Sequence, residues 1–321
     1  MTRDAVLLMA YGGPTSLDQV EAYYTDIRRG VAPPPELLEE LLGRYRAIGG
    51  ASPLSAIVQR QRAALEAELA QLTGIGTPLP VFAGMRHIAP RIATIVEEMA
   101  RDGIERFVAI ALAPQRSSNG IGYRRAVEAG LAAIGAGAPR AVFVDSWHDE
   151  PRFIEALALA THEAILRCEH PADARLMFTA HSLPARVVAE GDAYPAEIAT
   201  TARLVAERLG IGRFEQCFQS AGRTAEPWLG PDLRDELRRL ATEGVREVVV
   251  SPVGFVAEHL EVLYDIDIEA QAVARNVGLR LERARSMNDD PTFISALAEV
   301  AVHALAVEPA EPSPEPAGAV R

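Results

Sequence analysis

The sequence predicts an α/β fold with two doubly wound domains, each a four-stranded parallel sheet flanked by helices, around one cleft. Short apolar runs alternate along the chain with longer stretches of helical periodicity, which is typical of parallel sheets. Proline residues follow the apolar runs in both halves of the chain, as at Pro14, Pro114, Pro184 and Pro252. The repeated pattern favours two copies of one doubly wound unit, and ligands of such sheets bind beyond the carboxyl ends of the strands.

The predicted strands divide into two sets of four. The first set covers Ala5–Met9, Val81–Ala83, Phe107–Leu112 and Val142–Asp145. The second set covers Leu176–Thr179, Glu215–Phe218, Val248–Ser251 and Leu279–Glu282. We therefore expect an N-terminal domain over residues 1–149 and a C-terminal domain over residues 150–306. The second domain is expected to end in an amphipathic helix over Pro291–Ala306, and the Pro- and Glu-rich residues 307–321 are expected to form a disordered tail.

Composition and charge argue against a membrane-spanning protein and against a nucleic-acid-binding protein. Of the 321 residues 49% are hydrophobic, and no apolar run reaches the roughly 18 residues that a membrane span needs. The first residues lack the long apolar core of a signal peptide, so we expect a soluble, cytoplasmic protein. The net charge of −12 argues against nucleic-acid binding. A monomer is expected, because no apolar face is left uncommitted.

The only two cysteines, Cys168 and Cys217, are too few for a disulfide framework or for an iron–sulfur cluster held by four thiolates. Both have apolar neighbours and are expected to be buried. We expect no iron–sulfur cluster and no tightly bound cofactor. All 32 basic residues are arginine, and a planar guanidinium is well suited to bidentate binding of carboxylates.

Three carboxylates follow the apolar run of residues 248–251. After a Pro-Val-Gly turn, the pattern from about Ala257 predicts an α-helix that carries Glu261, Asp265 and Glu269 at successive spacings of four. Residues four apart lie on one face of an α-helix, where like charges repel each other. This acidic ladder (Glu261, Asp265 and Glu269) therefore costs stability unless cations bind it. Taken alone, the acidic ladder is better interpreted as a solvated acidic face, because most charge runs face solvent.

Two further residues stand at the ends of predicted strands. His181 follows the run of residues 176–179, where it is either a structural residue or a base or metal ligand. Nucleophilic hydrolysis is disfavoured, because the sequence lacks a Gly-x-Ser-x-Gly elbow. Tyr11 follows the first run and precedes two glycines that permit a tight turn. A phosphate loop is excluded there, because no Gly-Lys-Ser/Thr follows.

Arginines gather near glycine turns in the first domain. Four arginines, Arg28, Arg29, Arg44 and Arg46, with Ser52 nearby, are suited to binding the carboxylates of a ligand. The alternative is that these arginines pair at the surface with the glutamates of residues 36–40.

Many motifs along the chain together resemble the ferrochelatase family, and its soluble bacterial branch most of all. They are MAYGGP (9–14), YTDIRRG (24–30), RYRAIGGASPL (44–54), HIAP (87–90), LAP (112–114), SWHDEP (146–151), FTAHSLP (178–184), GDAYP (191–195), PWLGPD (227–232) and PVGFVAEHLEVLYD (252–265). The resemblance implies two Rossmann-like domains around a porphyrin cleft, and insertion of Fe²⁺ into a porphyrin in haem biosynthesis.

The resemblance also implies roles for single residues. His181 and Glu261 match the pair that meets the metal and the pyrrole protons, with Asp265 and Glu269 as outer metal ligands. Tyr11 matches the residue that faces the metal from the other side of the macrocycle. The positions expected to hold the propionates and the macrocycle edge are Arg28, Arg44, Tyr45, Ser52 and Tyr123. A neutral His181 of ordinary pKa is the expected proton acceptor, with Glu261 as its acidic partner.

Tyr11 in its MAYG context is similar to the coproporphyrin III ferrochelatases of Gram-positive-type bacteria. Coproporphyrin III is therefore the predicted substrate and coproheme the product, with protoporphyrin IX as the nearest alternative. A cobalt chelatase fits less well, because such relatives generally use two histidines at the metal. A non-catalytic porphyrin or haem carrier is a further alternative, although mere binding needs no base. Transient handover to a downstream haem-pathway enzyme stays open.

Three features depart from the family's pattern. Arg86 stands before the histidine of HIAP, Ala221 follows Gln-Ser, and residues 115–122 have the divergent sequence QRSSNGIG beside Tyr123.

Overall fold

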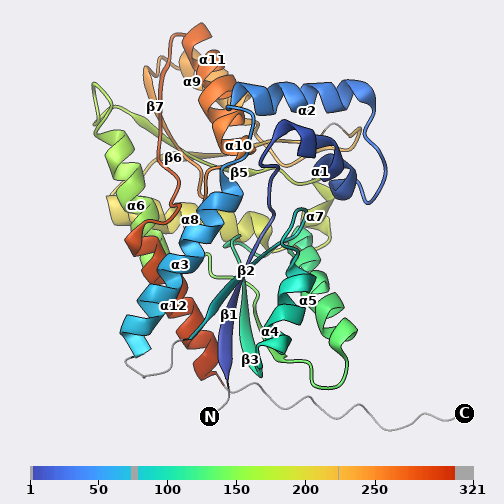
Figure 1. The fold of residues 1–321 in the computed structure, drawn as a ribbon. Coiled ribbons are helices and arrows are strands. Elements are labelled where there is room, and N and C mark those ends of the chain that lie inside the picture. Colours follow the sequence, from blue (N-terminus) through green and yellow to red (C-terminus); the bar gives the residue numbers. More distant parts are fainter. Residues whose placement is uncertain (1–2, 74–78, 223, 308–321) are drawn as a thin grey trace, which may run out of the picture.

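The computed structural model of the protein describes residues 3–73, 79–222 and 224–307. It contains two parallel sheets of four strands, in the orders β2-β1-β3-β4 and β6-β5-β7-β8. Figure 1 shows one sheet above the other, with helices around both. The strands are β1 (Asp4–Ala10), β2 (Val81–Met85), β3 (Arg106–Ala111), β4 (Arg140–Val144), β5 (Arg175–His181), β6 (Phe214–Gln219), β7 (Glu247–Ser251) and β8 (Arg280–Arg283).

The predicted fold class is confirmed, and each of the eight predicted strands is present. The two sheets have the same strand order, so the second half repeats the topology of the first. β5 extends two residues beyond its predicted end, because Ala180 and His181 still pair with Phe218 and Gln219 of β6. His181 is therefore the last residue of a central strand, and its backbone is fixed by the sheet.

Helices connect the strands and cover the sheets. They are α1 (Val20–Ile27), α2 (Pro35–Ala47), α3 (Leu54–Thr73), α4 (Ile92–Arg101), α5 (Ile121–Ile134), α6 (Pro151–Ile165), α7 (Arg186–Ala189), α8 (Tyr194–Leu209), α9 (Leu233–Thr242), α10 (Leu260–Leu263), α11 (Gln271–Asn276) and α12 (Pro291–Ala306). Short 3₁₀ turns η1 (Leu17–Gln19) and η2 (Ser118–Gly120) and the π-helix η3 (Asp265–Ala270) complete the described elements.

The final helix α12 links the two halves of the chain. It spans the predicted residues, and the Asp290 carboxylate caps it by accepting from the backbone N–H groups of Thr292 and Phe293. α12 packs on α3 of the first half and on α6 of the second, as the red and blue helices of Figure 1 show. Both sheets are therefore tied to one helix layer.

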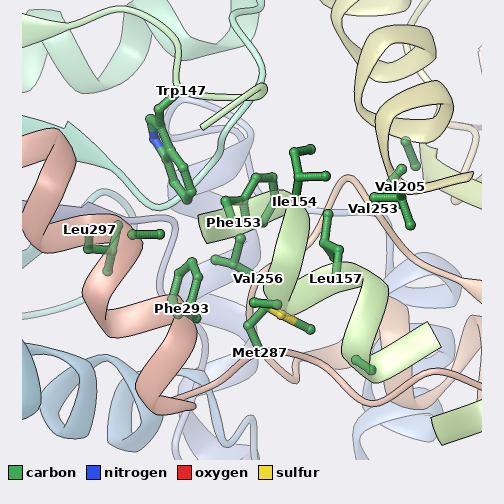
Figure 2. Close-up of a cluster of buried hydrophobic side chains, with 14 of the residues drawn as sticks. Trp147, Phe153, Ile154, Leu157, Val205, Val253, Val256, Met287, Phe293 and Leu297 are labelled. Atoms are coloured by element: carbon green, nitrogen blue, oxygen red, sulfur yellow. The ribbon is translucent and has the colours of Figure 1, made fainter. Parts of the chain in front are cut away.

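A buried apolar cluster lies under this helix layer (Figure 2). Trp147, Phe153 and Phe293 meet there, with ring centroids 5.0 to 6.3 Å apart. One continuous core contains side chains from both sheets. In the sequence, β1 to β4 precede residue 149 and β5 to β8 follow residue 150. The division into two domains at that point stays a prediction. Cys168 and Cys217 are buried and free, as predicted.

The prediction of one continuous α-helix under the acidic ladder is wrong. α10 begins at Leu260 and gives way to the π-helix η3 at Asp265. The Tyr264 carbonyl accepts from the N–H of Ile268 at 3.1 Å and from that of Glu269 at 2.9 Å, so the turn is wider than an α-helical one. The acidic ladder therefore spans two kinds of helix, with Glu261 in α10 and both Asp265 and Glu269 in η3. Apart from Val307, the predicted disordered tail lies outside the described residues.

Candidate active site

A large cleft of about 1050 Å³ lies where the carboxyl ends of strands from both sheets meet. Its lining includes Tyr11 after β1, Ala113 after β3, His181 at the end of β5 and Gly254 after β7. This is the position that the doubly wound topology predicts for a ligand. Its volume is sufficient for a ligand larger than most small metabolites.

Most of the predicted site residues line this one cleft. Those that do so are Tyr11, Arg44, Tyr45, Ser52, Tyr123, His181 and Glu261. Arg29 is among the described residues that line the cleft, whereas Arg28 is not. Arg28 ends α1, where its Nε donates to the Val31 carbonyl at 3.3 Å. Arg29 adopts a left-handed conformation with φ of 59°, which redirects the chain after the helix.

A second, smaller cavity of about 200 Å³ adjoins the cleft and contains the acidic ladder. Glu261, Asp265 and Glu269 all line it, together with Ser220 and Arg234. Glu261 and Arg44 line both cavities, so they stand at the junction between them. The acidic ladder thus reaches the cleft at its Glu261 end.

His181 and Glu261 form a hydrogen-bonded pair at this junction. His181 Nδ1 lies 2.9 Å from Glu261 Oε2, which leaves Nε2 as the nitrogen that can accept a proton or bind a metal. The Tyr194 hydroxyl donates to the His181 carbonyl at 3.0 Å, and the Gln219 amide donates to the Glu261 carbonyl at 2.8 Å. These bonds fix the backbone of both members of the pair.

A second histidine, which the sequence analysis did not single out, faces the same carboxylate. His259 Nε2 lies 3.7 Å from Glu261 Oε2, while its Nδ1 donates to the Ala257 carbonyl at 2.9 Å. The latter bond fixes the tautomer and turns Nε2 toward Glu261. The signal in the sequence is His259 two residues before Glu261, but its extended backbone (φ −159°) cannot be deduced from that spacing.

The electrostatics of the pair differ from the expectation of an ordinary histidine pKa. Burial lowers the pKa of His181, but the adjacent Glu261 carboxylate outweighs burial and leaves the pKa above its ordinary value. Burial raises the pKa of Glu261, whereas His181 and then His259 lower it by more, so it lies well below its usual range. Glu261 is therefore ionised at neutral pH, and it strengthens His181 as a base.

Asp265 is the buried middle carboxylate of the acidic ladder. The Ser220 hydroxyl donates to its Oδ2, and Arg44 Nη1 lies 3.4 Å from its Oδ1. Burial, followed by repulsion from Glu261, raises its pKa to about 6, although Ser220 and Arg44 oppose the shift. The charged form of Asp265 is thus held at a cost at neutral pH, and a bound cation would reduce that cost.

Glu269 is the outermost carboxylate, and its Oε2 lies 3.8 Å from Arg234 Nη1. In the described part of the chain, no three or more His, Cys, Asp or Glu side chains gather closely enough to hold a metal ion. The acidic ladder therefore offers single carboxylates in sequence rather than one closed site.

Tyr11 lines another part of the cleft. Its ring centroid lies 4.4 Å from that of His87, whose Nδ1 lies 2.7 Å from the Asp26 carboxylate. Gly12 follows with φ of 84°, and a Cβ there would clash with Ile88, so the turn requires glycine. Burial, followed by the nearby Glu261 charge, raises the Tyr11 pKa to about 12, which keeps the phenol protonated.

The departures in the sequence occupy the same walls. The Arg86 guanidinium lies 5.8 Å from the ring centroids of both Tyr11 and Tyr123. Ala221 lines both cavities. The divergent residues 115–122 are tied to the second half of the chain, because the Arg116 backbone N–H donates to the Glu197 carboxylate at 2.6 Å.

Comparison with known proteins places the chain in a family. The family model described as Ferrochelatase matches residues 3–305. The chain belongs to the ferrochelatase family. It is 45% identical to the ferrochelatase of Thermus thermophilus over 313 residues, which cover 92% of this chain and 97% of that one. It is 43% identical to the coproporphyrin III ferrochelatase of Geobacillus thermodenitrificans over 308 residues, which cover 94% and 96%.

Among solved structures, SirB from Bacillus subtilis with Fe³⁺ matches with a TM-score of 0.57 at 14% identity, over 95% of this chain and 96% of that one. At this identity the likeness shows the fold alone. The family membership confirms the predicted enzyme class, a ferrochelatase-type lyase of haem biosynthesis with iron as its metal. Within the described residues, no helix combines the length and the apolar character required to cross a membrane.

Proposed function

We propose that this ferrochelatase inserts Fe²⁺ into coproporphyrin III to form coproheme, with His181 as base and metal ligand and Glu261 as its acidic partner. The observation that carries the proposal is the His181–Glu261 pair at the junction between a large cleft and a cavity of carboxylates. Relatives that cover more than nine-tenths of the chain at 41% to 43% identity bear the name coproporphyrin III ferrochelatase, which supports the choice of porphyrin.

Proton removal is the part of the reaction that His181 and Glu261 are suited to perform. A free porphyrin carries two pyrrole N–H protons, and both must leave before the ring can bind a divalent metal. His181 in its neutral form accepts a pyrrole proton at Nε2, and the Glu261 carboxylate stabilises the resulting imidazolium. Because Glu261 raises the His181 pKa, the base is strong, but its neutral fraction increases only as the pH rises.

Metal delivery is the part assigned to the rest of the acidic ladder. Fe²⁺ is a substrate here, and it must dehydrate stepwise without being trapped. Asp265 and Glu269 are single oxygen ligands along the smaller cavity, and the imidazole and carboxylate at its inner end bind divalent first-row metals less permanently than thiolates do. With only two buried cysteines, we propose no iron–sulfur cluster and no tightly bound cofactor.

Porphyrin binding falls to polar groups in the first half of the chain. Arg44, Tyr45, Ser52 and Tyr123 line the large cleft and can donate hydrogen bonds to propionates. Arg29 also lines the cleft and adds a guanidinium next to Arg28, the residue that the family resemblance implies as a propionate ligand. Coproporphyrin III carries four propionates and protoporphyrin IX two, so coproporphyrin uses more of these donors. Tyr11 is proposed to approach the metal of the bound product.

The deciding experiment is anaerobic Fe²⁺ insertion into coproporphyrin III and protoporphyrin IX, followed by absorption under identical conditions without detergent. We expect a much larger kcat/KM for coproporphyrin III. A preference for protoporphyrin IX would overturn the choice of substrate and leave the proposed roles of His181 and Glu261 standing. Tight binding of both porphyrins without insertion would favour the carrier alternative instead.

His181→Ala tests the base under the same conditions. We expect it to abolish most turnover at saturating porphyrin, and near-wild-type turnover would remove His181 from the mechanism. Cytoplasmic location, a monomeric state and transient handover to a downstream enzyme stay predictions.

A further inference from the structure

The arginines beside the acidic ladder are arranged in a pattern that the proposed metal route does not explain. Each of the two outer carboxylates faces a guanidinium, Arg234 at Glu269 and Arg44 at Asp265. The inner carboxylate, Glu261, faces the imidazoles of two histidines instead. An imidazole can lose its proton and bind a metal, whereas a guanidinium always stays charged and repels one.

Arg234 is held by a neighbour other than Glu269. Its Nε and Nη2 donate to the two carboxylate oxygens of Asp232, each at 3.0 Å, which is a bidentate pair. Only Nη1 is directed at Glu269, at 3.8 Å, beyond hydrogen-bond distance. Asp232 is itself fixed, because it caps α9 by accepting from the Arg234 backbone N–H at 2.9 Å. The guanidinium is therefore held beside Glu269 by a partner other than that carboxylate.

Exposure places this group at the outer end of the smaller cavity. The Arg234 side chain is 47% exposed and that of Glu269 29% exposed, whereas that of Asp265 is only 7% exposed. Glu261 is 34% exposed, but it also lines the large cleft, whereas Glu269 and Arg234 line the smaller cavity alone. α9, which carries Arg234, packs directly on η3, which carries both carboxylates. A cation that enters the cavity from solvent thus meets Glu269 and Arg234 before it meets Asp265.

We propose that Arg234, anchored by Asp232, tunes the entrance of the metal route by competing with incoming Fe²⁺ for Glu269. This inference rests on the proposed role of the acidic ladder in metal delivery. Fe²⁺ at Glu269 would share its carboxylate with a fixed positive charge, so binding there is weak and the ion moves on toward Asp265. Arg234 is accordingly a positioning and tuning residue and does not touch the porphyrin.

Arg234→Gln tests the proposal, with Arg238→Gln as the matched control. Arg238 lies one turn further along α9 and pairs with Asp235 at 2.7 Å. Its substitution by Gln removes the same single positive charge as Arg234→Gln does. The readouts are the KM for Fe²⁺ in anaerobic insertion, and the Kd for Fe²⁺ from anaerobic calorimetry on porphyrin-free protein. We expect Arg234→Gln to lower both by about fivefold, the effect of one half-exposed ion pair.

The control variant and Glu269→Gln show whether Arg234 tunes Fe²⁺ binding. Arg238→Gln should leave both constants unchanged, and equal effects of the two variants would reduce the proposal to overall charge. An unchanged Kd in Arg234→Gln, with or without a change in kcat, would overturn it. Glu269→Gln separates the two levels of inference. If Glu269→Gln raises the KM for Fe²⁺ while Arg234→Gln has no effect, metal delivery along the acidic ladder is supported and tuning by Arg234 is refuted. If Glu269→Gln has no effect on this KM, metal delivery along the acidic ladder is itself refuted.

Asp232→Asn tests the anchor. Asparagine caps helices as well as aspartate does, but it no longer neutralises the guanidinium, which then turns toward Glu269. We expect a higher Kd for Fe²⁺, and no such effect when Asp232→Asn is added to Arg234→Gln. An equal rise in both backgrounds would mean that Asp232 binds the cation itself, and the anchoring role would be wrong.

Discussion

Asp265→Asn should stabilise the protein at neutral pH, although it removes a group of the proposed metal route. The Asp265 carboxyl has a pKa raised to about 6 by burial and by Glu261, against an ordinary value of 3.8. The folded state therefore binds this proton more tightly than the unfolded state does. The stabilising contribution is complete below about pH 4 and is lost as the pH rises through 6.

The size of the effect follows from the shift. About two pKa units at 1.36 kcal/mol per unit give about 3 kcal/mol as the cost of the charged form above pH 7. Asparagine cannot ionise, and its amide oxygen can still accept from the Ser220 hydroxyl. Loss of the ion pair with Arg44 removes part of the gain in stability, but Arg44 still forms an ion pair with Glu40 at 3.1 Å. We expect a net gain of about 1 to 3 kcal/mol at pH 8.

The measurement is urea denaturation of wild-type and variant proteins from pH 4 to pH 8, in the absence of metal. The advantage of Asp265→Asn should grow with pH and vanish near pH 4. Asp267→Asn is the matched control, because Asp267 lies in the same π-helix but binds Arg283 at 2.6 and 2.9 Å. That variant should lose about 1 to 3 kcal/mol. Destabilisation by Asp265→Asn at pH 8 would refute the assignment of a costly buried charge.

Three further substitutions test the site and the core. Glu261→Gln removes the carboxylate that raises the His181 pKa, so the rise of kcat/KM with pH should move to lower pH; an unmoved or higher midpoint would contradict the pairing. Tyr11→Phe should alter the absorption spectrum of the bound iron porphyrin, because phenol oxygen can ligate haem iron; an unchanged spectrum would count against that contact. Phe293→Ala should cost about 3 to 5 kcal/mol in urea denaturation, because the ring is fully buried between both halves of the chain; a loss below about 1 kcal/mol would show that the cluster can collapse around the gap.

The strands could be predicted because strands buried on both faces are continuous apolar runs. Each of the central strands β1, β3, β5 and β7 is buried along most of its length, so hydrophobicity alone marks it. Hydrophobicity marks the ends of the strands less sharply, because backbone pairing in the sheet continues through polar residues. His181 is such a case: it is bonded to β6 by the sheet, yet its side chain belongs to the cleft.

The site could be predicted as a set of residues but not as a geometry. Spacings of four suggested an α-helix under the acidic ladder, whereas the added residue of a π-turn depends on how η3 packs against α9 and α11. The choice between Arg28 and Arg29 is a second example. Arg29, left-handed after α1, lines the cleft, and nothing in the pair Arg-Arg specifies which of the two does so.

The groups that accompany the carboxylates show how the chain keeps three acidic side chains along one cavity. Glu269 has a guanidinium that it contacts only loosely, Asp265 has a hydroxyl donor and a raised pKa, and Glu261 has two imidazoles. Each device lowers the repulsion within the acidic ladder in a different way. They also make successive positions unequal toward a cation, because the guanidinium beside Glu269 repels a cation, whereas the imidazoles beside Glu261 can become metal ligands. On the proposed metal route, this gradient would favour movement of Fe²⁺ from Glu269 toward His181.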